Sequence, residues 1–178
     1  YRDRRDIHHD LNANLYAIVK LPFGFEYQMN FTPRYHWYEY MNHESAEHPE
    51  WAGDGGRSER KNEKTFNWQV DNILRWKKEF GEDHRVEATF LQNAEKGQWW
   101  KTVAQNKLYS PSDILGFHNI GAGTAPSVSS EDTYKTGDAL MGRLFYSFKD
   151  KYMLTASVRR DGYSAFGSMN PHAVFPAV

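Results

Sequence analysis

The chain has 178 residues, a net charge of −1 and no cysteine. The absence of cysteine excludes disulfide frameworks and thiolate metal sites. The balanced charge argues against a nucleic-acid surface, which needs a clustered basic excess. Aromatic residues make up 16% of the sequence, yet the mean hydropathy is only −0.82. This combination is typical of a sheet with one apolar and one polar face.

The first predicted elements are two strands, at residues 11–21 and 25–38, in which apolar side chains occupy the odd positions. A strand has a side-chain period of two, so each of these segments has one apolar and one polar face. Only Pro22, Phe23 and Gly24 separate them, which predicts a tight turn. Pro33 cannot donate a ladder hydrogen bond, so we expect a bulge or a gap in pairing there.

The rest of the chain continues as strands joined alternately by short and long connections. A long loop is expected at residues 41–64, a second irregular segment at 96–136 and a third loop at 161–171. Short turns are expected at residues 81–84 and 149–151. The expected strands, about seven with the first two, are residues 65–80, 85–95, 139–148, 152–160 and 172–178.

This layout predicts an all-β, antiparallel transmembrane β-barrel segment with short periplasmic turns and long extracellular loops. A Greek-key sandwich does not require such regular alternation. Aromatic residues flank the short turns and recur about 23 Å higher on a strand tilted by 45°, close to the roughly 25 Å apolar band of such barrels. The side chains expected to face lipid are Leu15, Val19, Phe25, Tyr27, Met29, Phe31, Trp68 and Leu74.

The last third of the chain carries a specific pattern. The run GRLFYSFKDKYMLTASVRRDGYSAFG at residues 142–167, followed by FPAV at 175–178, resembles the barrel signature of SusC/RagA-type TonB-linked outer-membrane transporters. The preceding stretch NILRWKKEFGEDHRVEATF, residues 72–90, is similar to the family's preceding hairpin. Tyr163 and Ala165 stand where the family usually has Ser and Arg, so no family role is assigned to them.

The resemblance implies that residues 1–178 form part of the barrel domain of a TonB-dependent receptor with a probable 22 strands. It implies location in the bacterial outer membrane, import of an oligosaccharide or peptide, energy from a TonB complex and a SusD-like surface lipoprotein as partner. No stretch resembles the family's plug, TonB box or N-terminal extension, so we expect a longer working chain. The alternative from the residues alone is a soluble β-sandwich carbohydrate-binding module.

Two groups of residues are candidate contact sites. Trp51, Trp99, Trp100 and Tyr109 are expected in the long loops, where they could stack on sugars, contact a partner or anchor the loops to each other. The family's corner motif contains Arg159, Asp161 and Gly162. The first two share a strand face and could bind substrate, although we favour a structural ion pair followed by an Asp-Gly turn.

No catalytic site, cofactor site or metal site is expected. His43 and His48 lie five residues apart in a predicted loop, which does not match a zinc-binding helix. No combination of nucleophile, base and orienting residue can be assembled from the sequence. We therefore do not expect an enzyme.

Overall fold

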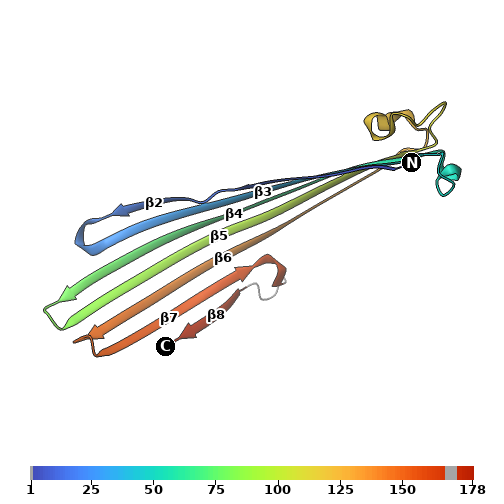
Figure 1. Cartoon of the computed structure of the whole chain (residues 1–178). Coiled ribbons are helices and arrows are strands. Elements are labelled where there is room, and N and C mark those ends of the chain that lie inside the picture. The colour runs from blue at the N-terminus through green and yellow to red at the C-terminus, as the bar shows by residue number, and fades with distance from the viewer. Residues whose placement is uncertain (1, 167–171) are drawn as a thin grey trace. The chain divides into compact units, whose positions relative to one another are not determined.

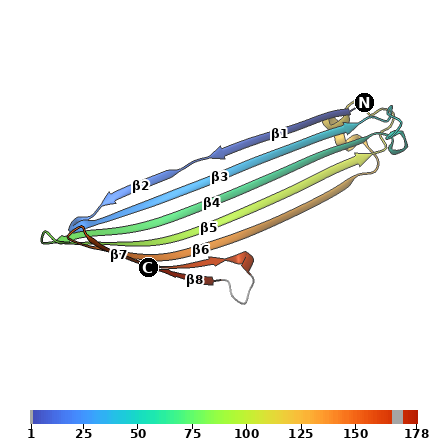
Figure 2. The ribbon, with the colours of Figure 1, turned by 60° about the horizontal axis from the view of Figure 1, so that its bottom comes forward.

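The computed structural model describes residues 2–166 and 172–178. Its described residues form one antiparallel sheet with the strand order β1-β3-β4-β5-β6-β7-β8, and β2 also pairs with β3 (Figures 1 and 2). The strands are β1 (Arg2–Asn12), β2 (Leu15–Lys20), β3 (Phe25–Glu44), β4 (Arg57–Phe80), β5 (His84–Lys107), β6 (Ser127–Phe148), β7 (Tyr152–Tyr163) and β8 (His172–Ala177).

Short 3-10 helices occupy four of the connections. They are η1 (Pro22–Gly24), η2 (Ala52–Asp54), η3 (Gly116–Ala122) and η4 (Ser164–Phe166). Among the described residues, no helix is long and apolar enough to cross a membrane.

Two compact units share the long strands. The first unit comprises residues 1–11, 34–66 and 98–133, and the second comprises residues 12–33, 67–97 and 134–178.

The strands extend further than the sequence pattern predicted. β3 reaches Glu44 and β4 starts at Arg57, so the first long loop is 45–56 rather than 41–64. β5 ends at Lys107 and β6 starts at Ser127, so the second long connection comprises residues 108–126 rather than 96–136. The additional segments carry polar side chains on both faces, and strand pairing needs only backbone groups, so hydrophobic alternation cannot reveal them.

Over residues 2–166 and 172–178 the sheet has eight strands rather than about seven. β1 begins at Arg2, in a polar stretch that the alternation at residues 11–21 did not include. The predicted third loop was also wrong at its start, because β7 continues through Tyr163. Residues 167–171 of that loop lie outside the described residues.

The predicted gap in pairing at Pro33 is confirmed. β3 itself is continuous, and the strand that is interrupted is the one that pairs with it at this point. β2 pairs with β3 from Leu15 opposite Phe31 to Lys20 opposite Glu26, and β1 ends at Asn12. The two residues between β1 and β2 face the proline, where the Ala13 amide still donates to the Pro33 carbonyl at 3.1 Å. Since proline has no N–H to return, the edge strand is interrupted at this point.

The three predicted tight turns lie together at one end of the second unit, as expected. The Trp76 indole N–H donates to the Phe23 carbonyl at 3.1 Å, which joins the first turn to the end of β4. The Lys149 amide donates to the Asp83 carbonyl at 2.7 Å, which joins the other two turns.

Strand register separates the side chains of the second unit into two faces. Leu15 lies opposite Phe31 on one face, and Leu144 lies opposite Ala156 on the corresponding face of the β6–β7 hairpin. These apolar side chains are not covered, since Leu15 is 58% exposed and Leu144 is 51% exposed. Among the described residues only Phe117 and Ala139 are buried apolar residues, so the apolar face carries no second layer.

The first turn generates a testable prediction about backbone fit. Gly24 has φ +85°, and a Cβ there would collide with the Lys77 carbonyl; Gly81 has φ +64° with open space around it. Alanine at either position would have to adopt a left-handed backbone conformation, which costs about 1–2 kcal/mol. Gly24→Ala should lower the free energy of unfolding by about 1–3 kcal/mol more than Gly81→Ala, because of the collision. Denaturant unfolding of the full-length protein measures both, and equal losses would contradict the close approach.

Candidate functional site

The polar face of the second unit carries a network that spans several strands. Arg75 on β4 binds two residues of β3, with its Nη1 donating to Glu26 at 3.0 Å and to Gln28 at 2.7 Å. Asp71 on β4 accepts from Asn93 of β5 at 2.6 Å and from Gln69 at 3.0 Å. These contacts hold carboxylates and amides in fixed positions on one surface.

A depression of about 360 Å³ lies on the same face. Amide, hydroxyl and carboxylate groups predominate in its lining, with one aliphatic side chain. The lining residues are Asn14, Tyr16, Ile18, Gln28, Asn30, Thr32 and Asp71. Such a surface can donate and accept hydrogen bonds with a hydrated, uncharged ligand group.

The corner motif forms the predicted ion pair. The Arg159 Nε donates to both carboxylate oxygens of Asp161, at 2.8 and 2.9 Å, and the two residues are neighbours on one face of β7. The expected Asp-Gly turn is wrong, because Gly162 lies within β7 opposite His172 of β8. A side chain at Gly162 would collide with Asp138 and His172, so close packing between strands explains the glycine. A substrate role for these residues is still a prediction.

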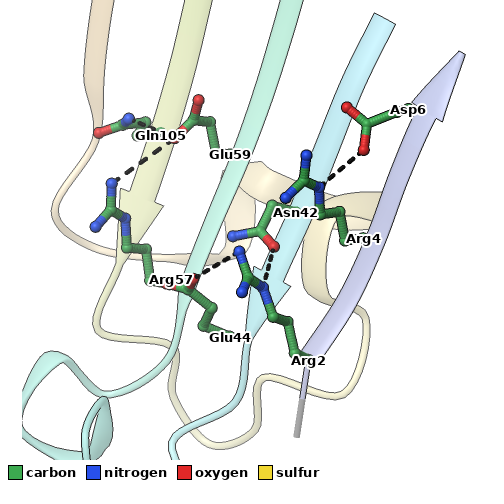
Figure 3. A network of polar contacts seen from close by, with 8 residues as sticks. All are labelled: Arg2, Arg4, Asp6, Asn42, Glu44, Arg57, Glu59 and Gln105. Atoms are coloured by element: carbon green, nitrogen blue, oxygen red, sulfur yellow. Dashed lines mark hydrogen bonds and ion pairs between the residues drawn. The ribbon is translucent and has the colours of Figure 1, made fainter.

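In the first unit, polar contacts join the strands near the long loops (Figure 3). Arg2 of β1 donates from Nε to the Asn42 side chain at 3.2 Å and pairs with Glu44 at 3.9 Å. Gln105 of β5 donates to Glu59 of β4 at 2.7 Å. Asn42 and Glu44 are buried, so these contacts satisfy polar groups that water does not reach freely.

Aromatic and charged side chains continue this pattern along the first unit. The Tyr38 hydroxyl donates to Asp6 at 2.7 Å. The Lys61 ammonium lies 4.8 Å from the centre of the Tyr38 ring and 5.4 Å from that of Tyr40, within cation–π range.

Trp99 and Trp100 were predicted in a loop, and this was wrong, because both lie within β5. Adjacent strand residues point to opposite faces, so the two tryptophans cannot form one binding surface. The Trp99 indole donates to Glu63 at 3.4 Å. The hydrophobic pattern missed this part of β5 because polar residues surround the pair.

Trp51 and Tyr109 do lie in the long loops. The Trp51 ring is 4.5 Å from the His48 ring. The Tyr109 amide donates to the Gly55 carbonyl at 3.0 Å, and its ring meets His43 edge-on at 6.3 Å. Tyr109 therefore anchors loop 108–126 against loop 45–56, whereas contact with a ligand is still a prediction for both residues.

A second link between these loops escaped the sequence analysis. His43 lies between Ser58, 2.9 Å from its Nδ1, and Asp113, 3.5 Å from its Nε2. Asp113 also accepts from the Ala46 amide at 2.8 Å. No local motif joins these residues, since they come from β3, β4 and loop 108–126.

The serine, histidine and aspartate resemble the members of a nucleophilic triad, but access excludes that chemistry. Ser58 is fully buried at 0% exposure, so its hydroxyl cannot reach a substrate. Among the described residues no group of three or more His, Cys, Asp or Glu side chains is placed to hold a metal ion. The arrangement is a structural link that fastens loop 108–126 to the ends of β3 and β4.

Asp113 is charged in this link. Burial by itself would raise the pKa of its carboxyl, but the Ala46 amide, the Ser45 hydroxyl and His43 together hold that pKa below its usual value. A carboxyl with a lowered pKa stabilises the folded loops at pH values above its unfolded pKa near 4. That stabilisation is lost as the pH falls through the lower, folded pKa.

This link generates a prediction for the loops. Asp113→Asn should increase the hydrogen-exchange rate of the Ala46 amide about tenfold, because a charge-assisted hydrogen bond is lost. It should also remove the loss of protection, measured against the intrinsic exchange rate at each pH, that the wild type shows on acidification below about pH 4. Exchange measured by mass spectrometry on the full-length protein tests both effects, with Glu47→Gln in the same loop as control. Unchanged Ala46 exchange in Asp113→Asn would contradict the link.

Comparison with known proteins gives matches in sequence and in structure, although no family model matches the chain. TonB-dependent receptor P26 of Formosa agariphila is 28% identical over 131 residues, which cover 72% of this chain and 13% of the receptor. TonB-dependent receptor P39 of the same organism is 30% identical over 115 residues, which cover 64% of this chain and 11% of the receptor. The chain therefore spans about an eighth of these relatives.

A solved structure of the RagAB peptide transporter superposes with a TM-score of 0.88 at 18% identity, covering 98% of this chain and 20% of the other. An 'open-open' RagAB structure gives a TM-score of 0.83. The matched proteins are named as receptors, transporters and importers, and none of these names is that of an enzyme. These similarities bear out the resemblance at residues 142–178: the chain is similar in sequence to a segment of TonB-dependent receptors, and its fold matches a segment of the RagAB structures.

Proposed function

We propose that this chain forms part of the barrel wall of an outer-membrane, TonB-dependent importer of oligosaccharides or peptides. The observation that carries the proposal is the separation of faces in the second unit. One face presents uncovered apolar side chains, and the other presents the networks around Arg75 and Asp71. A barrel wall needs this arrangement, with lipid outside and a polar lumen inside.

Aromatic side chains on the turns support the orientation in the membrane. Phe25, Trp76 and Phe80 form a chain of ring contacts at 6.2 and 6.5 Å next to the first two turns. Phe148 and Tyr152 flank the third turn with their rings 6.5 Å apart. An aromatic girdle at one membrane interface consists of such residues, and short turns lie on the periplasmic side.

Strand length supports a surface partner. A strand that crosses the hydrocarbon at a tilt of about 45° needs roughly 9–11 residues, whereas β4 and β5 have 24 residues each. The excess residues carry the polar contacts of the first unit and the long loops. We assign this part to the cell surface, where a SusD-like lipoprotein would contact it.

The working protein is expected to be longer than these 178 residues. β8 and the β1–β2 edge have backbone groups that need partners, because an unpaired group in hydrocarbon costs several kcal/mol. The remaining strands would supply those partners, and the regions that bind TonB would lie elsewhere in the longer chain. Residues 1–178 then form one arc of the wall.

Uptake measurements test the importer. Cells that carry the full-length receptor with its lipoprotein should take up labelled oligosaccharides or peptides only while TonB is energised. A strain that lacks the receptor and a wild-type strain treated with a protonophore are the controls. The 178-residue segment reconstituted alone should take up nothing, and energy-dependent uptake by the segment would overturn the assignment.

A substitution on the apolar face tests its contact with lipid. Met29 lies opposite Ala17 on that face, so Met29→Arg should lower the free energy of unfolding in lipid vesicles by about 2–4 kcal/mol. Thr32→Arg is the control, because Thr32 lines the depression on the polar face. Urea unfolding of the full-length receptor measures both, and equal costs would show that the two faces do not differ in environment.

A further inference from the structure

The apolar face of the second unit is not evenly filled, because it contains a groove of about 580 Å³. This volume is typical of a small-molecule site, for which roughly 300–1,000 Å³ is usual. Aliphatic and aromatic side chains of this face line the groove, and among them the rings of Phe25 and Trp76 lie 6.2 Å apart. Thr89, Arg143 and Ser157 also border it, although strand alternation directs their side chains to the opposite face.

Small residues at fixed strand positions account for the groove. In the β6–β7 register Gly142 lies opposite Val158, and Ala156 lies opposite Leu144. Each of these pairs therefore joins a branched side chain to a residue with a methyl group or no side chain. Ala88 on β5 is a third small residue of the lining. The hollow thus follows from the size of these side chains.

Gly142 in particular has no explanation within the sheet. A glycine inside a strand weakens it, and it often marks a bulge or the close approach of another group. The β6–β7 register passes through Gly142 without a bulge, and a Cβ there would meet no described atom of another part of the chain within 4 Å. By contrast, a Cβ at Gly97, Gly137 or Gly162 would collide with side chains of neighbouring strands. The open space above Gly142 belongs to the groove.

Further strands of a longer chain would not cover this groove. Each of the strands β4 to β7 already has a neighbour on both sides, so added strands would extend the sheet from its edges. A second copy of the chain is also a poor occupant. A two-fold interface centred on the groove would place one hollow against another and leave a void without packing contacts.

Polar groups share this face at the ends of the strands near the tight turns. On β6 the Tyr146 hydroxyl oxygen lies 2.7 Å from the Nδ1 of His84 on β5. On β4 the Lys78 ammonium lies 5.1 Å from the centre of the Phe80 ring. These residues are at the level of the aromatic girdle, which in a membrane barrel is the level of the lipid headgroups. The groove therefore begins next to the headgroup region and runs into the apolar band.

We propose that the groove holds an acyl chain of a phospholipid from the periplasmic leaflet, with the phosphate beside His84, Tyr146 and Lys78. This inference rests on the part of the proposed function that places the apolar face against lipid. Hydrocarbon surrounds free and bound lipid alike, so binding depends on the dispersion contacts that fill the hollow. The phosphate adds hydrogen bonds from the polar side chains and attraction to the ammonium.

Phospholipid binding to the purified full-length receptor tests the groove. The receptor is delipidated in detergent and titrated with palmitoyl-oleoyl phosphatidylethanolamine, and native mass spectrometry counts the bound molecules. The wild type should bind a first phospholipid molecule more tightly than any later one. Ala156→Leu and Gly142→Leu fill the groove from two different strands, so each should weaken this first binding about tenfold.

Two controls separate the groove from general contact with lipid. Ala17 lies opposite Met29 on the apolar face and does not line the groove, so Ala17→Leu adds the same side chain elsewhere. This variant should bind phospholipid as the wild type does. Palmitoyl-oleoyl glycerol has the same acyl chains without the phosphate, and it should bind the wild type about tenfold more weakly.

Three results would overturn the site. If neither leucine variant weakens binding, or if Ala17→Leu weakens it equally, the groove does not select a lipid. If the glycerol lipid binds as tightly as the phospholipid, the assigned headgroup position is wrong. If the leucine variants separate a receptor dimer and leave lipid binding unchanged, the groove is an interface between copies. The importer then still stands on its uptake data, and absence of uptake with intact lipid binding would overturn only the importer.

Discussion

Backbone pairing between antiparallel strands is the interaction on which the other features depend. In the β6–β7 hairpin the register runs without a slip from Phe148 opposite Tyr152 to Gly137 opposite Tyr163. A shift of β7 by one residue would turn its side chains over, placing Ser157 on the face where Ala156 now lies. The tight turn fixes this register, with Lys149 and Asp150 in left-handed conformations at φ 53° and 51°. Lipid contact and a polar lumen would therefore both follow from the turn geometry.

The first unit adds side-chain contacts to its backbone pairing. It has almost no buried apolar side chains, with Phe117 as the exception among the described residues. Its strand ends are joined by side-chain contacts such as Arg2 with Asn42 and Gln105 with Glu59. Exposed ion pairs contribute only about 0–1 kcal/mol each, so order here depends on many contacts made together. The His43 and Asp113 link then fixes the loops to strand ends that, in the part of the chain the structure describes, bury Phe117 as their one apolar side chain.

The sequence was sufficient for features that depend on local spacing. Alternation at residues 25–38 and the turn residues at 22–24 and 149–151 predicted strands, faces and hairpins, because these follow from a period of two and from φ preferences. The same rule predicted that Arg159 and Asp161 share a face. It failed where both faces are polar, as in β1 and around Trp99, since pairing there leaves no hydrophobic signal. A rule based on local spacing also could not predict the contact between Arg75 and Glu26, which are 49 residues apart, or the contact between His43 and Asp113. Predicting such contacts requires knowing which strands pair and in which register.

Pairing between residues two apart explains how a polar wall can remain close to neutral. Side chains at i and i+2 of a strand are neighbours on one face, so an arginine or lysine can bind an acidic residue of its own strand. The described strands repeat this arrangement, in Arg4 with Asp6, Arg57 with Glu59, Lys61 with Glu63, Arg85 with Glu87 and Arg159 with Asp161.

A cation that lacks such a neighbour is therefore informative, and the sequence alone can identify it. Of the arginines on the polar face of the second unit, Arg75 and Arg143 have no acidic residue two positions away. Strand register then reduces this set, because Arg75 finds Glu26 on β3. Sequence spacing and strand register together give an ion-pair partner to each arginine on this face except Arg143.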